Sequence, residues 1–181
     1  MTIRPIISMT GEHHFNEVVF SDVFVPDEQV VGAIGAGWAQ VTSELAYERS
    51  GPERLLSTFV LLDALIGDLA SRNGDARTED ALGRVVSRLW ACRQMSLAVA
   101  GALADGEAPE IAAALVKDVG TRLENEIIEV ARLLTAAVPD PEGPGMAGLL
   151  AQAVLHAPGF TLRGGTNEIL RGIVARGLAL R

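Results

Sequence analysis

Residues 163 to 181 combine residue types that can bind an oxygen-rich ligand. Gly164 and Gly165 permit backbone conformations of either handedness, and Thr166 can cap a helix that starts directly after it. Glu168 falls in the first turn of that helix, where the helix dipole favours an acidic side chain. Such a turn presents free backbone N–H groups to a ligand. The same pattern also ends many ordinary loops, so by itself it predicts only a turn and a capped helix.

Glu48 is the second candidate for chemistry, because it interrupts a face of apolar residues on the helix predicted for residues 38 to 72. A carboxylate on a buried face is costly to ionise unless it is paired. Enzymes use such environments to make a general base or acid effective near neutral pH. The other residues of this face, at alternating steps of three and four, are Trp38, Val41, Leu45, Pro52, Leu55, Phe59, Leu62 and Ile66.

Two ordinary interpretations of Glu48 compete with this one. The apolar face can open to solvent at a kink, or Glu48 can pair with Arg49 or Arg54 and serve only the fold. Glu44 lies one turn earlier and adds a like charge at i,i+4, which destabilises an isolated helix. This repulsion argues that the two glutamates do not both lie idle on the surface.

Helical periodicity dominates the chain after residue 37 and predicts a bundle of long antiparallel helices. Gly51–Pro52 is the expected kink of the first helix, and Asn73-Gly74-Asp75 is its expected end. Thr78 is the expected cap of the second helix, and residues 139–145 form an expected loop. The predicted helices cover about 38–72, 78–104, 109–137 and 146–156, with a final helix from Thr166.

Residues 3 to 31 differ from the rest and predict two or three short strands. Two strands cannot bury themselves, so this piece must pack on the helices or take strands from elsewhere. We therefore expect a mainly α protein, an antiparallel helical bundle (35–181) preceded by a few short β-strands (1–34). The strand-spaced residues are Phe15, Val18, Phe20, Val23 and Val25.

Composition restricts the classes of partner. The 181 residues are 49% hydrophobic but only 4% aromatic, and the net charge of -8 argues against nucleic acid and anionic membrane surfaces. The longest apolar run, residues 97–104, is far too short to cross a bilayer, so we expect a cytoplasmic protein. Cys92 is the single cysteine, and the adjacent pair His13 and His14 lacks a metal-ligand spacing, so we expect no disulfide and no structural metal.

Several motifs together resemble the acyl-CoA dehydrogenase family. The glycine turn followed by Arg171-Gly172-Ile173-Val174-Ala175-Arg176-Gly177-Leu178 is similar to the C-terminal signature of these flavoproteins. The family's passage from its middle β-domain into its C-terminal helical domain resembles Ile3-Arg4-Pro5-Ile6, residues 15–18, Phe24-Val25-Pro26 and Gly35-Ala36-Gly37-Trp38. By this resemblance residues 1–34 are a remnant of the β-domain. The chain would then be about the last half of a family member, inactive by itself.

The resemblance implies FAD as cofactor and an acyl-CoA as substrate. Most family members place the catalytic glutamate just before the Gly-Thr of the turn, where this chain has Gly164. The isovaleryl and long-chain type has a small residue there and a glutamate on the helix, at the position of Glu48. By this analogy Glu48 removes the α-proton of the acyl-CoA while a hydride leaves the β-carbon for the flavin. The N–H of Gly164, with a flavin hydroxyl, would polarise the thioester carbonyl.

Other roles also follow only from the resemblance. An ion pair between Arg49 and Glu53 at the surface is the alternative for Arg49. Two family motifs are missing: a Phe-Gly near residues 72–78, and a Gln followed by a glycine-rich run, where this chain has the 139–145 loop. The implied contacts are Tyr47, Arg49 and Gly165 with substrate, Thr166, Asn167 and Glu168 with flavin, and Arg72 with the flavin of a neighbouring subunit.

The family also implies an oligomer, either homo- or hetero-oligomeric and tetramer-like, with an electron-transfer flavoprotein as electron acceptor. The base on the helix favours a branched or bulky acyl chain. One alternative is a non-catalytic helical assembly subunit of a heteromeric flavoprotein. Another is a related flavin oxidase or monooxygenase, which Glu48 disfavours because an α-proton base points to dehydrogenation.

Overall fold

The computed structural model describes residues 1–72 and 75–180, apart from the side chain of Ala46. Backbone contacts divide the chain into two compact units, Met1–Glu44 and Leu45–Arg181. The domain boundary predicted between residues 34 and 35 separates two parts by their resemblance to family domains. The division by contacts at residue 44 does not test it, so it stays a prediction. The mainly α fold with a short antiparallel sheet is confirmed.

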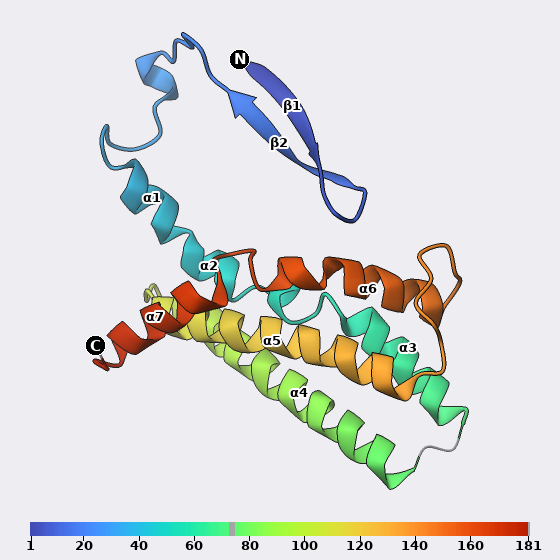
Figure 1. The fold of residues 1–181 in the computed structure, drawn as a ribbon. Coiled ribbons are helices and arrows are strands. Elements are labelled where there is room, and N and C mark those ends of the chain that lie inside the picture. The colour runs from blue at the N-terminus through green and yellow to red at the C-terminus, as the bar shows by residue number, and fades with distance from the viewer. Residues whose placement is uncertain (73–74, 181) are drawn as a thin grey trace. The chain divides into compact units, whose positions relative to one another are not determined.

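The first unit contains the only sheet in the described ranges. Strands β1 (Thr2–Ile7) and β2 (His13–Val19) pair antiparallel, with Ile3 opposite Val18 and Ile6 opposite Phe15. Every residue of both strands is exposed, since two strands offer no second layer to pack against. A 3-10 turn, η1 (Asp27–Gln29), and helix α1 (Gly37–Ser43) complete the unit (Figure 1).

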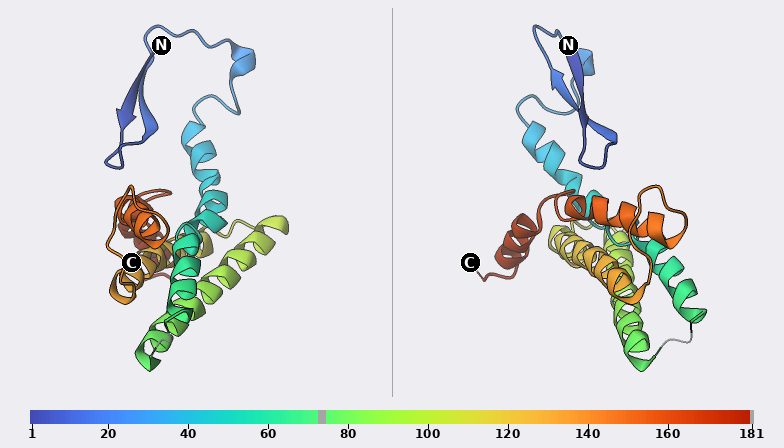
Figure 2. Two further views of the ribbon diagram at one scale, coloured as in Figure 1. Left: turned by 90° about the vertical axis from the view of Figure 1, so that its right-hand side faces the viewer. Right: turned by 45° about the vertical axis from the view of Figure 1, so that its right-hand side comes forward.

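The second unit is a helical bundle built around α5 (Glu110–Leu134). This helix contacts every other helix of the unit, and both views in Figure 2 show it among them. Its buried face carries Val116, Leu123 and Ile127, which join Leu62 and Leu150 in one apolar core. The surrounding elements are α2 (Leu45–Arg49), η2 (Pro52–Arg54), α3 (Phe59–Ala70), α4 (Ala76–Ala104), α6 (Met146–Phe160) and α7 (Asn167–Gly177).

The prediction of one long helix from residue 38 to residue 72 is wrong. Gly51 is extended (φ -62°, ψ 156°) and Pro52 has no N–H, so the chain breaks after α2, turns through η2 and starts again at α3. The expected apolar face is broken with it: Leu55 and Leu62 are buried, whereas Trp38 is exposed. The expected helix end at Asn73-Gly74 lies outside the described residues.

Three other boundaries differ from the predictions. Asp75, and not Thr78, caps α4, because the Asp75 carboxylate accepts the N–H of Thr78 at 2.8 Å, a bond that lowers the pKa of Asp75. Helix α5 ends at Leu134, since the next residue is extended. Helix α6 continues past its expected end through Pro158 to Phe160, because a proline in the last turn removes only one hydrogen bond. None of the helices in the described ranges combines the length and apolar character needed to span a membrane.

Gly120 allows η2 to approach α5 closely. A Cβ at this position would overlap with the carbonyl oxygen of Arg54 and lie 3.4 Å from the sulfur of Cys92. Cys92 is fully buried on α4, and burial raises the pKa of its thiol to about 11. The backbone of Arg54 is therefore in direct contact with the centre of the bundle.

Replacing Gly120 with Ala should destabilise the protein by about 1–3 kcal/mol, because a backbone oxygen must move to admit the methyl group. Gly83→Ala is the matched control, since Gly83 is an exposed glycine inside α4 with nothing near its missing Cβ. It should raise stability by about 0.5–1 kcal/mol. Urea unfolding of both variants measures the two effects, and equal stability would contradict the close approach.

Candidate active site

Glu48 and the glycine turn, far apart in the sequence, lie against each other. A Cβ built on Gly164 would lie 3.3 Å from Oε1 of Glu48. Arg49, the residue after Glu48, donates from Nε to the carbonyl oxygen of Gly164 at 3.2 Å, across 115 positions of the chain. Because α2 and α7 both pack on α5, the end of α2 meets the turn that leads into α7. The carboxylate thus faces a stretch of backbone without side chains.

The turn itself has the conformation that its glycines predict. Gly164 (φ +67°) and Gly165 (φ +97°) are both left-handed, which disfavours any other residue. Thr166 caps α7 as predicted, its hydroxyl accepting the N–H of Ile169 at 3.4 Å. No hydrogen bond within the described ranges uses the N–H of Gly164, Gly165 or Thr166. These donors are available to an oxygen ligand.

Glu48 is held by a buried arginine. Arg54 forms an ion pair with Oε1 of Glu48 and donates from Nε to its carbonyl oxygen at 3.1 Å. The Arg54 side chain is 7% exposed and that of Glu48 is 43% exposed. The expectation that Glu48 is buried on an apolar face is therefore wrong, because the helix that would bury it is broken. Pairing with Arg54, one of the two alternatives, is confirmed, and the carboxylate remains accessible.

Arg49 is buried beside the turn and does not form the surface ion pair with Glu53. Its exposed fraction is 8%, and burial lowers its pKa, opposed by the nearby charges of Glu48 and Glu110. Glu53 instead lies 3.5 Å from Nε of Arg54. Arg49 therefore supports the turn, on the same side as Glu48.

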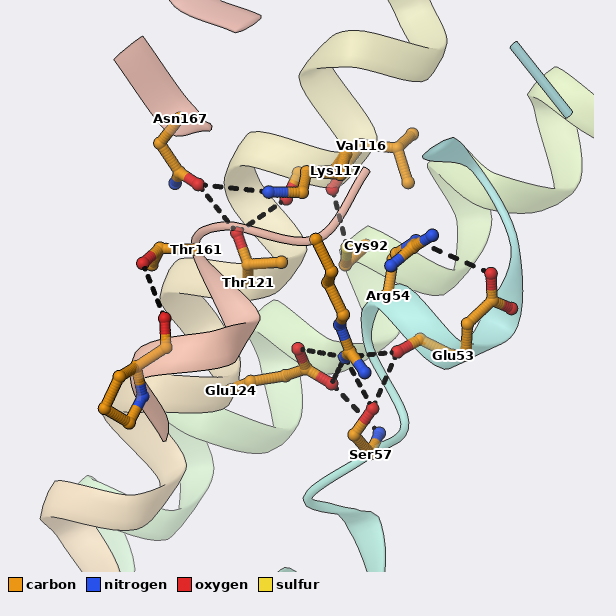
Figure 3. Close-up of polar contacts among 12 residues, drawn as sticks. Glu53, Arg54, Ser57, Cys92, Val116, Lys117, Thr121, Glu124, Thr161 and Asn167 are labelled. Carbon is orange, nitrogen blue, oxygen red and sulfur yellow. Dashed lines mark hydrogen bonds and ion pairs between the residues drawn. The ribbon is translucent and has the colours of Figure 1, made fainter. Parts of the chain in front are cut away.

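Polar side chains on the buried face of α5 support the turn from inside the bundle. Lys117 donates from Nζ to the carbonyl oxygen of Gly165 at 2.7 Å and to Oδ1 of Asn167 at 3.3 Å. Thr121, one helical turn later, donates to the same Oδ1 at 3.2 Å. Figure 3 shows Lys117, Thr121 and Asn167 converging between α5 and the start of α7.

Glu124 continues this polar face of α5 and binds the residue that precedes the glycines. Its side chain is fully buried, and Arg163 donates to its two oxygens at 3.3 and 3.0 Å. Ser57 donates its N–H to Oε1 of Glu124 at 3.0 Å (Figure 3). Arg163 also donates to the carbonyl oxygen of Glu53. Burial raises the pKa of Glu124, while Arg163 opposes the shift. The ion pair joins the turn to α5, and the hydrogen bond from Ser57 joins the segment after η2 to the same carboxylate.

Three residues that support the site were not predicted from the sequence: Lys117, Thr121 and Glu124. Their spacing of four and three residues places them on one face of α5. That face is also the apolar one, so three polar residues at helical spacing among buried positions were the available signal.

The remaining predicted site residues occupy different places. Tyr47 is exposed on α2, next to Glu48. The side chain of Asn167 is buried and faces α5, and that of Glu168 is exposed, with bonds to its own N–H and to Thr166 lowering its pKa. Arg72 pairs with Asp68 just after α3, whose end lies at the opposite end of the bundle from α2 and α7 (Figure 1). Its predicted contact with a neighbouring subunit's flavin stays a prediction.

The ammonium of Lys117 lies in a strongly cationic environment. Burial lowers its pKa from 10.5 to about 8, and neighbouring guanidinium groups add to this shift. The charged groups around it are Arg54 from η2, Arg163 from the turn, Asp118 from α5, Arg49 from α2 and Glu168 from α7.

Lys117 should make the protein more stable as the pH rises from about 8 towards 10.5. The unfolded chain keeps the lysine proton up to about pH 10.5, whereas the folded protein loses it near pH 8. The cost of burying the charge is therefore fully present below pH 8 and is relieved progressively between pH 8 and 10.5. Relative to Lys117→Met, which lacks the titrating group, the wild type should gain up to about 3 kcal/mol over this range. Denaturant unfolding at several pH values measures the gain, and a constant difference between the two proteins would contradict it.

Comparisons with known proteins agree with this fold. The family model described as acyl-CoA dehydrogenase, C-terminal domain, matches residues 35–179. The chain is similar to acyl-CoA dehydrogenase FadE34 of Mycobacterium tuberculosis, at 29% identity over 97% of this chain and 24% of that protein. It is also similar to acyl-CoA dehydrogenase IpdE1 of the same organism, at 30% identity over 96% of this chain and 46% of that protein.

A solved structure has the same fold. A variant of the Tcur3481-Tcur3483 steroid ACAD superposes with a TM-score of 0.83 at 26% identity, over 99% of this chain and 49% of that one. The chain thus spans between about a quarter and a half of the length of these relatives. The matched family model covers most of the chain, including α2 and the glycine turn, so the chain belongs to the acyl-CoA dehydrogenase family.

Proposed function

We propose that this chain is the part of an FAD-dependent acyl-CoA dehydrogenase that carries the catalytic base, and that Glu48 is that base. One observation carries the proposal: Oε1 of Glu48 lies 3.3 Å from the position of a Cβ at residue 164. Residue 164 corresponds to the turn position at which most family members have their glutamate. A carboxylate on α2 therefore reaches the space that a carboxylate on the turn would otherwise fill.

The groups around Glu48 suit the removal of a proton next to a thioester. The α-proton of an acyl-CoA becomes acidic when its carbonyl oxygen receives hydrogen bonds, and the N–H groups of Gly164 and Gly165 are unused in the described structure. The proton passes to the carboxylate of Glu48, which the ion pair with Arg54 holds in position. Bound FAD supplies the acceptor for the hydride that leaves the β-carbon, so a Cα=Cβ double bond results.

The residues at the start of α7 fit a flavin contact in part. The turn N–H groups, the exposed Glu168 and the positive end of the α7 dipole can meet an oxygen-rich cofactor. Asn167 would contact the cofactor through its backbone, since its side chain is hydrogen-bonded to Lys117 and Thr121. Arg72 would serve a neighbouring subunit. Further FAD contacts must come from regions that the relatives have in addition, so we infer that the chain alone is inactive.

The substrate we infer is a bulky acyl-CoA, with a steroid as a candidate acyl group. Two observations support this: the base is on the helix, and the similar solved structure is titled a steroid ACAD. An electron-transfer flavoprotein as acceptor rests on family resemblance, and a cytoplasmic location remains the expectation drawn from the sequence. An oligomer, homo- or hetero-oligomeric, is supported by Val86, Trp90 and Leu97, which are exposed on α4 at helical spacing.

Replacing Glu48 with Gln should abolish dehydrogenation while the fold remains. General-base catalysis is worth about 100-fold to 10,000-fold, so flavin reduction by acyl-CoA should slow by at least about 100-fold. The measurement is the anaerobic loss of the oxidised flavin band in the FAD-loaded enzyme that contains this chain. Exchange of the substrate α-proton in heavy water should be lost in parallel.

Glu53→Gln is the matched control, because the Glu53 carboxylate also lies beside Arg54, whereas Glu53 meets Arg163 of the turn through its backbone carbonyl, which the substitution keeps. It should retain wild-type rates of flavin reduction. Unchanged turnover in Glu48→Gln, or equal losses in both variants, would overturn the assignment of the base. Oxygen consumption during turnover would instead favour a flavin oxidase built on the same scaffold.

A further inference from the structure

Lys117 is fully buried in α5, yet it reaches the glycine turn. Its Nζ binds the carbonyl oxygen of Gly165 and Oδ1 of Asn167, on the two sides of the start of α7. Burying an ammonium is costly, and an apolar side chain of similar length would fill the same space. The partners of Nζ therefore indicate why a lysine is found at this position.

Two carbonyl groups determine where the N–H groups of the turn point. No peptide bond in the described residues is cis, and in a trans unit the N–H lies antiparallel to the C=O. Lys117 holds the carbonyl of Gly165, so the N–H of Thr166 points away from the ammonium. Arg49 holds the carbonyl of Gly164, so the N–H of Gly165 points away from the guanidinium.

These contacts matter because glycine restrains its neighbouring peptide units so weakly. Both Gly164 and Gly165 accept φ of either sign, so an unheld unit can rotate at little cost. A rotated unit would present a carbonyl oxygen where an N–H should be. Such an oxygen repels the oxygen of a ligand instead of stabilising it.

We propose that Lys117 is a positioning residue: by binding the carbonyl of Gly165 it fixes the Gly165–Thr166 peptide unit of the turn, with the N–H of Thr166 directed away from α5 towards the ligand, and it does so without touching the substrate. The inference rests on the proposed function, because that function supplies the ligand. It adds a requirement inside the bundle, on the buried face of α5.

The charge state of Lys117 offers a direct way to observe this contact. Its pKa of about 8 brings its titration into an accessible range. A charged donor forms a hydrogen bond roughly twice as strong as a neutral one. Loss of the proton should therefore change the carbonyl of Gly165 measurably. The neighbouring charges are Arg49, Arg54, Arg163, Asp118 and Glu168, as described above.

Selective isotope labelling isolates the peptide unit in question. Glycine directly precedes threonine only at Gly120–Thr121 and Gly165–Thr166. A chain labelled with carbonyl-13C glycine and 15N threonine therefore gives two signals in an NMR experiment that correlates a carbonyl with the following N–H. Thr121→Val removes the first signal and so assigns the second. This variant also deletes a hydroxyl that binds Asn167 but leaves the contact of Lys117 with Gly165, which makes it the matched control.

We expect the Gly165–Thr166 signal to move with pH, with a midpoint near 8, in the wild type and in Thr121→Val. In Lys117→Met the signal should be displaced and should lose this step. A wild-type signal that is constant from about pH 7 to about pH 10, or a wild-type signal in Lys117→Met, would overturn the inference. The wild-type titration needs no variant, so it decides the question even if Lys117→Met does not fold.

Kinetics of the FAD-loaded enzyme supply the second readout. Lys117→Met should have a kcat at least about 10-fold below that of Thr121→Val, with little change in KM, because the glycine turn that contacts the thioester in the transition state is held less firmly. Equal kcat values in the two variants would overturn the inference. A wild-type enzyme without acyl-CoA turnover would overturn the proposed function instead, and the pH step of the Gly165–Thr166 signal would then decide the inference alone.

Discussion

The burial of charged groups on one face of α5 is the constraint on which the site depends. Lys117 and Glu124 are both fully buried, and a buried charge without a partner would cost several kcal/mol. Their partners are the carbonyl of Gly165 and the guanidinium of Arg163, which both belong to the turn. The bundle can therefore close around α5 only with the turn in place. The same network that completes the fold thus places Gly164 beside Glu48.

Under the proposed function, a catalytic carboxylate can be supplied either from the turn or from α2. Gly164 has a left-handed φ, and a side chain there would be strained and would lie close to Arg54 and Glu48. With the carboxylate on α2, the turn can keep two consecutive glycines, and the buried Arg54 holds the carboxylate. In this arrangement the proposed base is oriented by η2 instead of by the turn, and the close packing of η2 depends on Gly120.

Features fixed by neighbours in the sequence were predictable, and features fixed by distant contacts were not. The capped start of α7 follows from the glycines and Thr166 themselves, so the sequence alone was sufficient. The burial of Glu48 was predicted wrongly, because helical periodicity assumes an unbroken helix and the chain breaks at Gly51. Lys117 and Glu124 were missed, since their partners lie 48 and 39 residues further along the chain. Only the packing of α7 and its preceding turn on α5 shows that these charges are satisfied.

The pairing of Glu124 with Arg163 also limits how such a sequence can change over evolutionary time. Loss of Arg163 leaves the fully buried carboxylate of Glu124 with Ser57 as its described hydrogen-bond partner. Loss of Glu124 leaves the guanidinium of Arg163 without its carboxylate and near the buried ammonium of Lys117. Breaking a buried pair from one side costs about 3–5 kcal/mol, which is a large part of the stability of an ordinary domain. Replacing both with apolar residues can be nearly neutral. The two positions should therefore covary among relatives, with single-substitution intermediates rarely seen.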